Sequence, residues 1–105
     1  MNKQFGDGFD QLTDTSHIES LKLNNSATGE QLSIDNIPGK QASVKILYGI
    51  ACDNNFKISV KQAALGLKLY GDYTQEELDN PGSHPNIKLL IDTIANNYEW
   101  AVASS

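Results

Sequence analysis

Two short glycine-containing segments have the residue types needed to hold an anion. Residues 38–41 (Pro-Gly-Lys-Gln) and 81–85 (Pro-Gly-Ser-His-Pro) each stand directly before an expected helix. A helix N-terminus presents unpaired amide N–H groups and a partial positive charge, and a glycine lets an anion approach the backbone. A lysine adds a full charge, and a histidine can donate to an anion or carry a proton near neutral pH. The candidate ligand-binding residues are therefore Gly39, Lys40, Gly82, Ser83 and His84.

Both segments also have a simpler interpretation, as ordinary turns that lead into helices. The spacing Gly-x-x-x-x-Gly-Lys of a complete phosphate loop is absent. All eight cationic side chains are lysines, so any anion site must rely on lysine, backbone amides or histidine instead of the bidentate grip of arginine.

Other kinds of chemistry find little support in the residue pattern. His17, Cys52 and His84 are far apart in the sequence, and the acids of residues 72–79 lack the order of a calcium loop. Cys52 stands near the end of an apolar helix, where a thiol is usually a small buried hydrophobe, and it could act with His84 only if the fold brought them together. We therefore expect no catalytic residue, no metal and no cofactor.

The charges are distributed unevenly along the chain. The formal net charge of −5 argues against nucleic-acid binding. Residues 36–71 hold five lysines and one acid, whereas the segments on both sides are acidic. This pattern indicates either complementarity within the molecule or a basic patch for a small anion or an acidic partner.

The sequence predicts a cytoplasmic protein that does not enter a membrane. No apolar run approaches the roughly 18–20 residues that span a bilayer, and the first residues lack the apolar region of a signal peptide. The single cysteine, Cys52, excludes an internal disulfide and suits a reducing compartment.

Alternating apolar residues predict three strands. Residues 18–23 and 30–35 are expected to pair as a hairpin, and Tyr98, Trp100 and Val102 alternate in a final strand over 98–103. Together they predict a small three-stranded antiparallel sheet. If the final strand lies at the edge, its unpaired backbone groups could join a second copy, so a homodimer is one hypothesis.

Helical spacing predicts three to four helices packed on this sheet. A helix is expected from Gln41 to about Cys52, and another over 60–70 behind a capping box of Ser59 and Gln62. A capping box at 74–77 should open a short helix. The last helix is expected over 86–96 with Leu90 and Ile91 buried, and Pro85 suits the first position of this helix, which needs no N–H. Phe5, Phe9 and Leu12 suggest a further short helix at the start, with Asp7 as its N-cap. The fold class is thus α+β, as a single domain over residues 1–105.

Two stretches together resemble a known family. They are Pro38-Gly39-Lys40-Gln41-Ala42-Ser43, and the run Ala64-Leu65-Gly66-Leu67-Lys68-Leu69-Tyr70 followed by Asn80-Pro81-Gly82-Ser83-His84-Pro85-Asn86-Ile87. The pair resembles a bacterial family of proteins of about this length that is catalogued as a domain of unknown function. Ser83 departs from the lysine that this family would have there. The resemblance implies a bacterial origin and the fold boundaries, and it implies no activity.

Two function classes follow from the sequence. The preferred hypothesis is a non-catalytic cytoplasmic domain that binds a protein partner or itself. The alternative is a small-anion-binding protein or an enzyme that uses the two helix starts. If Lys40 and His84 lay far apart on opposite faces, a single site containing both would be excluded.

Overall fold

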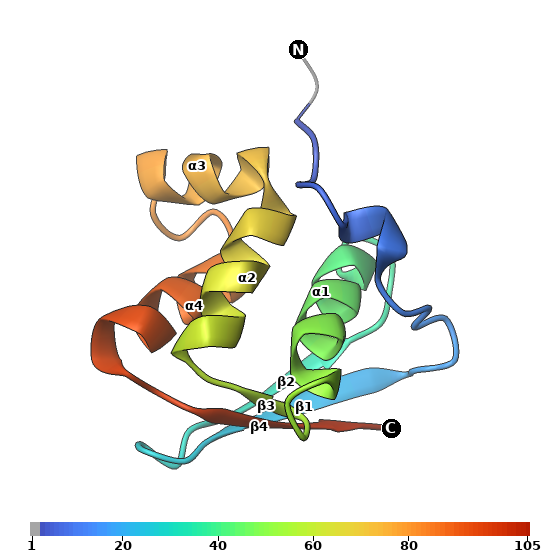
Figure 1. Ribbon diagram of the computed structural model, residues 1–105, viewed down its shortest axis with the longest axis vertical. Coiled ribbons are helices and arrows are strands. Elements are labelled where there is room, and N and C mark those ends of the chain that lie inside the picture. The colour runs from blue at the N-terminus through green and yellow to red at the C-terminus, as the bar shows by residue number, and fades with distance from the viewer. Residues whose placement is uncertain (1–2) are drawn as a thin grey trace.

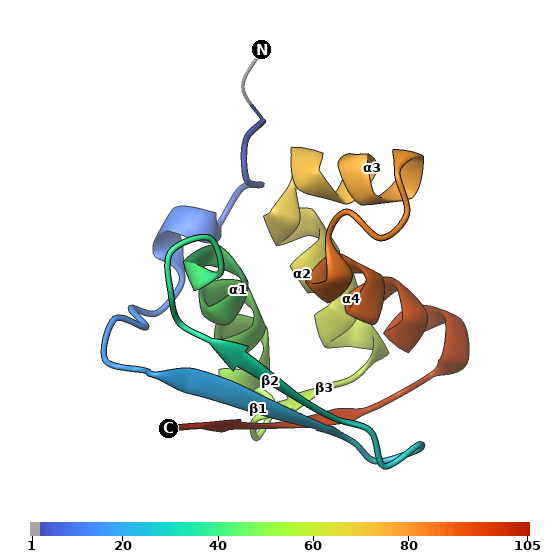
Figure 2. The same cartoon turned by 180° about the vertical axis from the view of Figure 1, so that it is seen from behind.

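A twisted antiparallel sheet forms one layer of the protein, and helices cover one of its faces (Figures 1 and 2). The computed structural model describes residues 3–105. Within these residues the strand order is β2-β1-β4-β3, and all neighbouring strands are antiparallel. The α+β class is confirmed. The elements in chain order are η1 (Phe9–Gln11), β1 (Ser20–Asn25), β2 (Gln31–Asp35), α1 (Gln41–Cys52), β3 (Lys57–Ile58), α2 (Val60–Tyr70), α3 (Asp72–Asp79), α4 (Pro85–Asn96) and β4 (Trp100–Ser104).

The predicted hairpin is confirmed as β1 and β2, with β1 starting and ending two residues later than expected. Leu21 lies opposite Ile34 and Leu23 opposite Leu32, so the apolar side chains of both strands share the face that the helices cover. At the end of β1, the side-chain oxygen of Asn25 accepts the amide hydrogens two and three residues later, at 2.9 and 3.2 Å. This Asx turn starts the connection between the strands.

The sheet has a fourth strand that the sequence analysis missed. β3 contains only Lys57 and Ile58, and Ile58 pairs with Trp100 of β4. Two residues are too few to show an alternating pattern, so nothing in the local sequence marks this strand. The chain reaches it through a sharp turn after α1, where Asn55 and Phe56 both have positive φ angles.

β4 therefore lies inside the sheet, and the condition for an edge-to-edge homodimer through this strand is not met. It pairs with β1 on one side and with β3 on the other. The edge strands among the described residues are β2 and β3.

α1 and α2 begin and end where the sequence predicts. The Ser59 amide donates to Gln62 Oε1 at 3.2 Å, which confirms the capping box at the start of α2. Gly66 lies where α2 meets α4, and a Cβ atom there would be only 2.7 Å from Cδ1 of Leu90 and 3.1 Å from Cδ1 of Ile50. The missing side chain thus lets the two helices pack closely.

α3 begins at Asp72, before the capping box predicted at 74–77. Thr74 is inside the helix, and its hydroxyl donates to the Leu67 carbonyl at 2.7 Å instead of capping. The chain's N-terminal segment sets the start of the helix, because Gln4 and Asp72 exchange two hydrogen bonds of 3.0 Å each. A contact between residues so distant in sequence leaves no local pattern to predict it from.

The helix expected over Phe5, Phe9 and Leu12 is reduced to the 3-10 turn η1, which follows Gly8 and not the expected cap Asp7. The residues before it run along α2, where the Gly6 amide donates to the Leu69 carbonyl at 2.9 Å. Gly8, inside the expected helix, has a φ angle of +95°, which a right-handed helix does not allow.

α4 begins at Pro85 as predicted, but its buried face is rotated slightly. Leu90 is fully buried, whereas Ile91 is only partly buried and Leu89 takes its place in the core. Near its C-terminal end α4 is joined to the sheet, because Trp100 Nε1 donates to Thr93 Oγ1 at 2.9 Å. Within residues 3–105, every helix is too short or too polar to cross a membrane.

Candidate functional site

The starts of α1 and α4 open onto the same cavity, which we call the helix-start cavity. It has a volume of about 360 Å³. Gly39 and Lys40 line it from the start of α1, and Ser83 and His84 line it from the start of α4. Gly82 is not among the lining residues. The structure therefore brings together four of the five candidate residues. The full lining is Ser33, Ile34, Gly39, Lys40, Ser43, Tyr70, Ser83, His84, Pro85, Asn86 and Ile87.

The α1 side of the cavity offers donors that have no acceptor within the helix. Lys40 is the N-cap residue, its carbonyl accepts the Val44 amide, and its own amide donates to Ile37. The amides of residues 41–43 have no intrahelical partner, as in any first turn. The Lys40 side chain is exposed and forms no ion pair within residues 3–105. This side could hold a small anion.

On the α4 side, the protein's own carboxylate already occupies the loop amides. Glu77 is only 3% exposed, and its two oxygens accept the amide hydrogens of Gly82 at 2.8 Å and of His84 at 2.6 Å. These two hydrogen bonds lower the pKa of Glu77, so it is ionised near neutral pH. Glu77 thus provides at this loop the negative charge that an external anion would otherwise supply.

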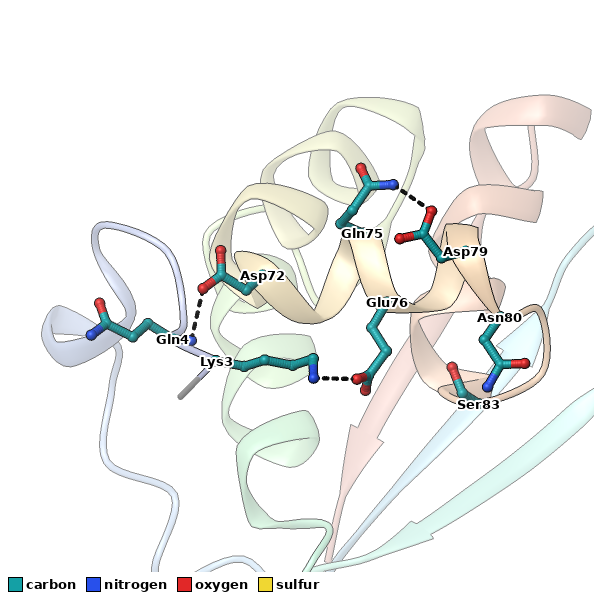
Figure 3. Close-up of a pocket in the computed structure, with 8 residues that line it drawn as sticks. All are labelled: Lys3, Gln4, Asp72, Gln75, Glu76, Asp79, Asn80 and Ser83. Atoms are coloured by element: carbon teal, nitrogen blue, oxygen red, sulfur yellow. Dashed lines mark hydrogen bonds and ion pairs between the residues drawn. The ribbon is translucent and has the colours of Figure 1, made fainter. Parts of the chain in front are cut away.

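The His84 imidazole is also engaged. Its Nε2 lies 2.5 Å from Glu76 Oε1, and the ring meets the edge of Tyr73 at a centroid distance of 5.7 Å. The other oxygen of Glu76 pairs with Lys3 Nζ at 2.5 Å (Figure 3). The hydrogen bonds from Lys3 and His84 lower the pKa of Glu76. This network ties the N-terminal segment and the start of α4 to α3.

Tyr70 and Ser43 also line the cavity and are hydrogen-bonded to each other. The Tyr70 hydroxyl donates to Ser43 Oγ at 2.7 Å. Burial raises the pKa of Tyr70 to about 12, although the Ser43 hydrogen bond acts in the opposite direction. Tyr70 is therefore a neutral hydrogen-bonding group here and not a general base at physiological pH.

The remaining candidates for chemistry are separate from this cavity. Cys52 Sγ donates to the Gly49 carbonyl at 3.3 Å, and neither Cys52 nor His17 lines the cavity. Among residues 3–105, no group of three or more His, Cys, Asp and Glu side chains could hold a metal ion.

A match to a known family covers almost the whole chain, from residue 5 to residue 104. The protein belongs to DUF2322, a family of uncharacterised proteins conserved in bacteria. The family resemblance seen in the sequence is thereby confirmed. No match was found among curated proteins or among solved structures. Membership of DUF2322 brings no assigned activity, so function has to be argued from this chain's own surface.

This DUF2322 chain has a further concave surface, which no sequence motif indicated. A groove of about 440 Å³ runs between α1 and α2. Its apolar residues include Ile50 and Leu65, and Leu65 is 49% exposed. Lys61 and Lys68 line the same groove, and neither forms an ion pair within the described part of the chain. The lining of this α1–α2 groove is Gly49, Ile50, Asp53, Asn54, Lys61, Gln62, Ala64, Leu65 and Lys68.

The charge distribution was the one signal in the sequence that pointed to this surface. Both lysines of the groove belong to the basic segment 36–71. Helical spacing puts Lys61, Leu65 and Lys68 on one stripe of α2, but only the packing of α1 beside α2 turns that stripe into the wall of a groove.

Proposed function

We propose that this chain is a non-catalytic cytoplasmic protein-binding domain and that the α1–α2 groove is its partner-binding surface. The observation that carries the proposal is the pair of unpaired lysines, Lys61 and Lys68, on either side of the exposed Leu65. With one acid, Asp53, in the same lining, the groove has a net positive charge. The non-catalytic part is supported by the cavity residues, because His84 and Glu77 are both engaged in hydrogen bonds within the protein.

The chemistry of the groove favours an acidic amphipathic helix as its occupant. Apolar side chains of such a helix would cover the exposed Ala64 and Leu65, and its acids would meet the two lysines. The lysines also raise the rate of encounter with an acidic partner, because opposite charges steer association. Their amine groups would keep their hydration at the rim, while the exposed apolar area supplies most of the affinity.

A designed helical peptide tests this proposal. The probe carries two glutamates seven residues apart with leucines between them, and the matched control replaces both glutamates with glutamine. Titrated into isotope-labelled protein, the acidic peptide should shift the amide signals of residues 49–54 and 61–68. The glutamine peptide should bind more weakly.

Lysine variants identify the surface. Lys61→Glu/Lys68→Glu should weaken binding of the acidic peptide by about tenfold or more, because two exposed ion pairs of about 0.2–1 kcal/mol each become repulsions of similar size. Lys22→Glu/Lys57→Glu, on the strands of the sheet, changes the net charge equally and serves as the control. An equal loss in both double variants, or shifts confined to other residues, would contradict the proposal.

A second candidate function is anion binding in the helix-start cavity. It is favoured by the observation that Lys40, Ser83 and His84, from two helix starts, line one cavity. Because Glu77 already accepts from Gly82 and His84, the donors left for an external anion are mainly Lys40 and the first amides of α1.

Inorganic phosphate tests this second candidate. Titration into labelled protein should move the amide signals of residues 39–43, and Lys40→Ala should reduce the response whereas Lys22→Ala should not. No shift at millimolar phosphate would leave protein binding as the only candidate.

A further inference from the structure

α3 carries an exposed acidic stripe whose charge is opposite to that of the two lysines in the α1–α2 groove. Asp72, Gln75, Leu78 and Asp79 are all exposed, and Leu78 is 54% exposed. Helical spacing places these four residues, which we call the α3 stripe, on one side of the helix. Figure 3 shows Gln75 and Asp79 hydrogen-bonded to each other on this side, at 2.8 Å.

The charges of the α3 stripe match those of the groove in spacing. Asp72 and Asp79 are seven residues apart on α3, and Lys61 and Lys68 are seven residues apart on α2. At a rise of 1.5 Å per residue, each pair spans about 10.5 Å along its helix axis. Each stripe also contains one exposed leucine. Leu65 lies between the two lysines of α2, whereas Leu78 directly precedes Asp79 and so stands at the edge of the α3 stripe. Two helices with these stripes could meet through two ion pairs and a leucine contact.

A molecule's own α3 does not fill its own groove. No groove-lining residue comes from α3, and α3 lies beyond the end of α2, at the far side of the molecule from the sheet (Figures 1 and 2). Both surfaces are exposed within residues 3–105. Each acid of the stripe accepts one hydrogen bond within the molecule, Asp72 from the Gln4 amide and Asp79 from Gln75 Nε2, which leaves its second carboxylate oxygen for a lysine. The nearest source of an acidic helix with the right spacing is a second copy of the chain.

We propose that the α3 stripe of one molecule docks into the α1–α2 groove of another. This inference rests on the proposed function, since it names the occupant of the same groove. The two surfaces are different parts of the molecule, so the contact is head-to-tail. An open chain of molecules then has one unused groove at one end and one unused stripe at the other. The association therefore grows with concentration into open chains, or closes into a ring where the rotation between neighbouring molecules allows it.

Two single variants test the proposal sharply, because a head-to-tail contact can be capped. Leu78→Asp removes the stripe and keeps the groove, whereas Leu65→Asp removes the groove and keeps the stripe. Both leucines are about half exposed, so both variants should fold, and circular dichroism checks this. Leu78→Gln and Leu65→Gln serve as milder replacements if either aspartate variant fails to fold.

Sedimentation equilibrium from micromolar to millimolar protein gives the readout. The native chain should self-associate, and each variant alone should have an association constant at least tenfold lower, because an exposed leucine no longer becomes buried on contact. An equimolar mixture of the two variants should form a complex that stops at one copy of each. Raising sodium chloride from about 0.05 M to about 0.5 M should weaken association several-fold, as the ion pairs become screened.

Several results would overturn the inference. The inference fails if the native chain stays monomeric at millimolar concentration, or if either variant associates as strongly as the native chain. It also fails if the mixture of the two variants forms no one-to-one complex. If the inference fails while the acidic peptide still binds the groove, the occupant is a foreign acidic helix and the proposed function stands. If the peptide also fails to bind, the proposed function falls with it.

Discussion

Replacing Leu90 with alanine should lower the free energy of unfolding by about 3–5 kcal/mol. Leu90 is fully buried at the contact between α2 and α4, and it faces Gly66, which has no side chain. Leu90→Ala leaves a cavity beside Gly66. A helix backbone cannot move into this cavity as a flexible side chain could, so most of its volume should remain. This places the expected cost in the upper part of the range for such substitutions.

The same geometry predicts strong coupling between Leu90 and Gly66. In the native protein, Gly66→Ala would put a Cβ atom 2.7 Å from Leu90 Cδ1. Overpacking of this kind costs about 1–3 kcal/mol, against a gain in helix propensity of about 1 kcal/mol, so we expect Gly66→Ala to destabilise. In the Leu90→Ala background that obstacle is gone, and Gly66→Ala should stabilise by about 1 kcal/mol. Only the flexible end of Ile50, at 3.1 Å, must still adjust.

Urea denaturation of the four proteins in this cycle measures the coupling directly. Two controls report on the phase of α4: Ile91→Ala should cost less than Leu90→Ala because Ile91 is only partly buried, and exposed Lys88→Ala should change stability by no more than about 0.5 kcal/mol. If Gly66→Ala has the same effect with and without Leu90, the reasoning about this contact is refuted.

Three further outcomes are expected. Hydrogen bonds from the loop amides lower the pKa of Glu77 below its usual 4.5. The stabilising effect of these hydrogen bonds is complete above about pH 4.5 and is lost as the pH falls through the lower folded-state pKa. In urea melts between about pH 5 and about pH 2, Glu77→Gln should therefore lose less stability than the native chain. Tyr70→Phe should remove a step in tyrosinate absorbance centred near pH 12, and a titration curve unchanged by the substitution would contradict the burial argument. Gly71→Ala should lower the melting temperature more than Gly39→Ala. Both glycines have a positive φ angle, but only at Gly71 would a Cβ atom meet backbone, at 2.5 Å from the Gln4 carbonyl oxygen.

Part of the protein was predictable from the sequence because it depends on neighbours in the chain. α1 occupies the predicted range, Ser59 and Gln62 form their capping box, and Pro85 begins α4. In each case the decisive interaction lies within one or two helical turns, so residue types and spacing suffice to identify it. The hairpin was predictable for the same reason, since Leu32 and Ile34 alternate with polar residues across a short turn.

The candidate surfaces depended much more on tertiary structure. Charge segregation marked residues 36–71 as basic, but the groove exists only because α1 packs beside α2. The residue types at both helix starts were recognised, and the fold alone decided that Lys40 and His84 face one cavity.

Other features were decided by contacts between residues distant in sequence. β3 is a strand only because Ile58 pairs with Trp100, which lies 42 positions further along the chain. α3 starts earlier than predicted because Asp72 is hydrogen-bonded to Gln4. Glu77, expected in a capping box, is instead buried and accepts hydrogen bonds from the amides of Gly82 and His84. A hydrogen bond that depends on the rest of the chain being folded leaves no periodic trace in the local sequence. Local chemistry therefore determined most of the helices and the hairpin, whereas long-range packing decided the order of the strands and which charged groups remained available at the surface.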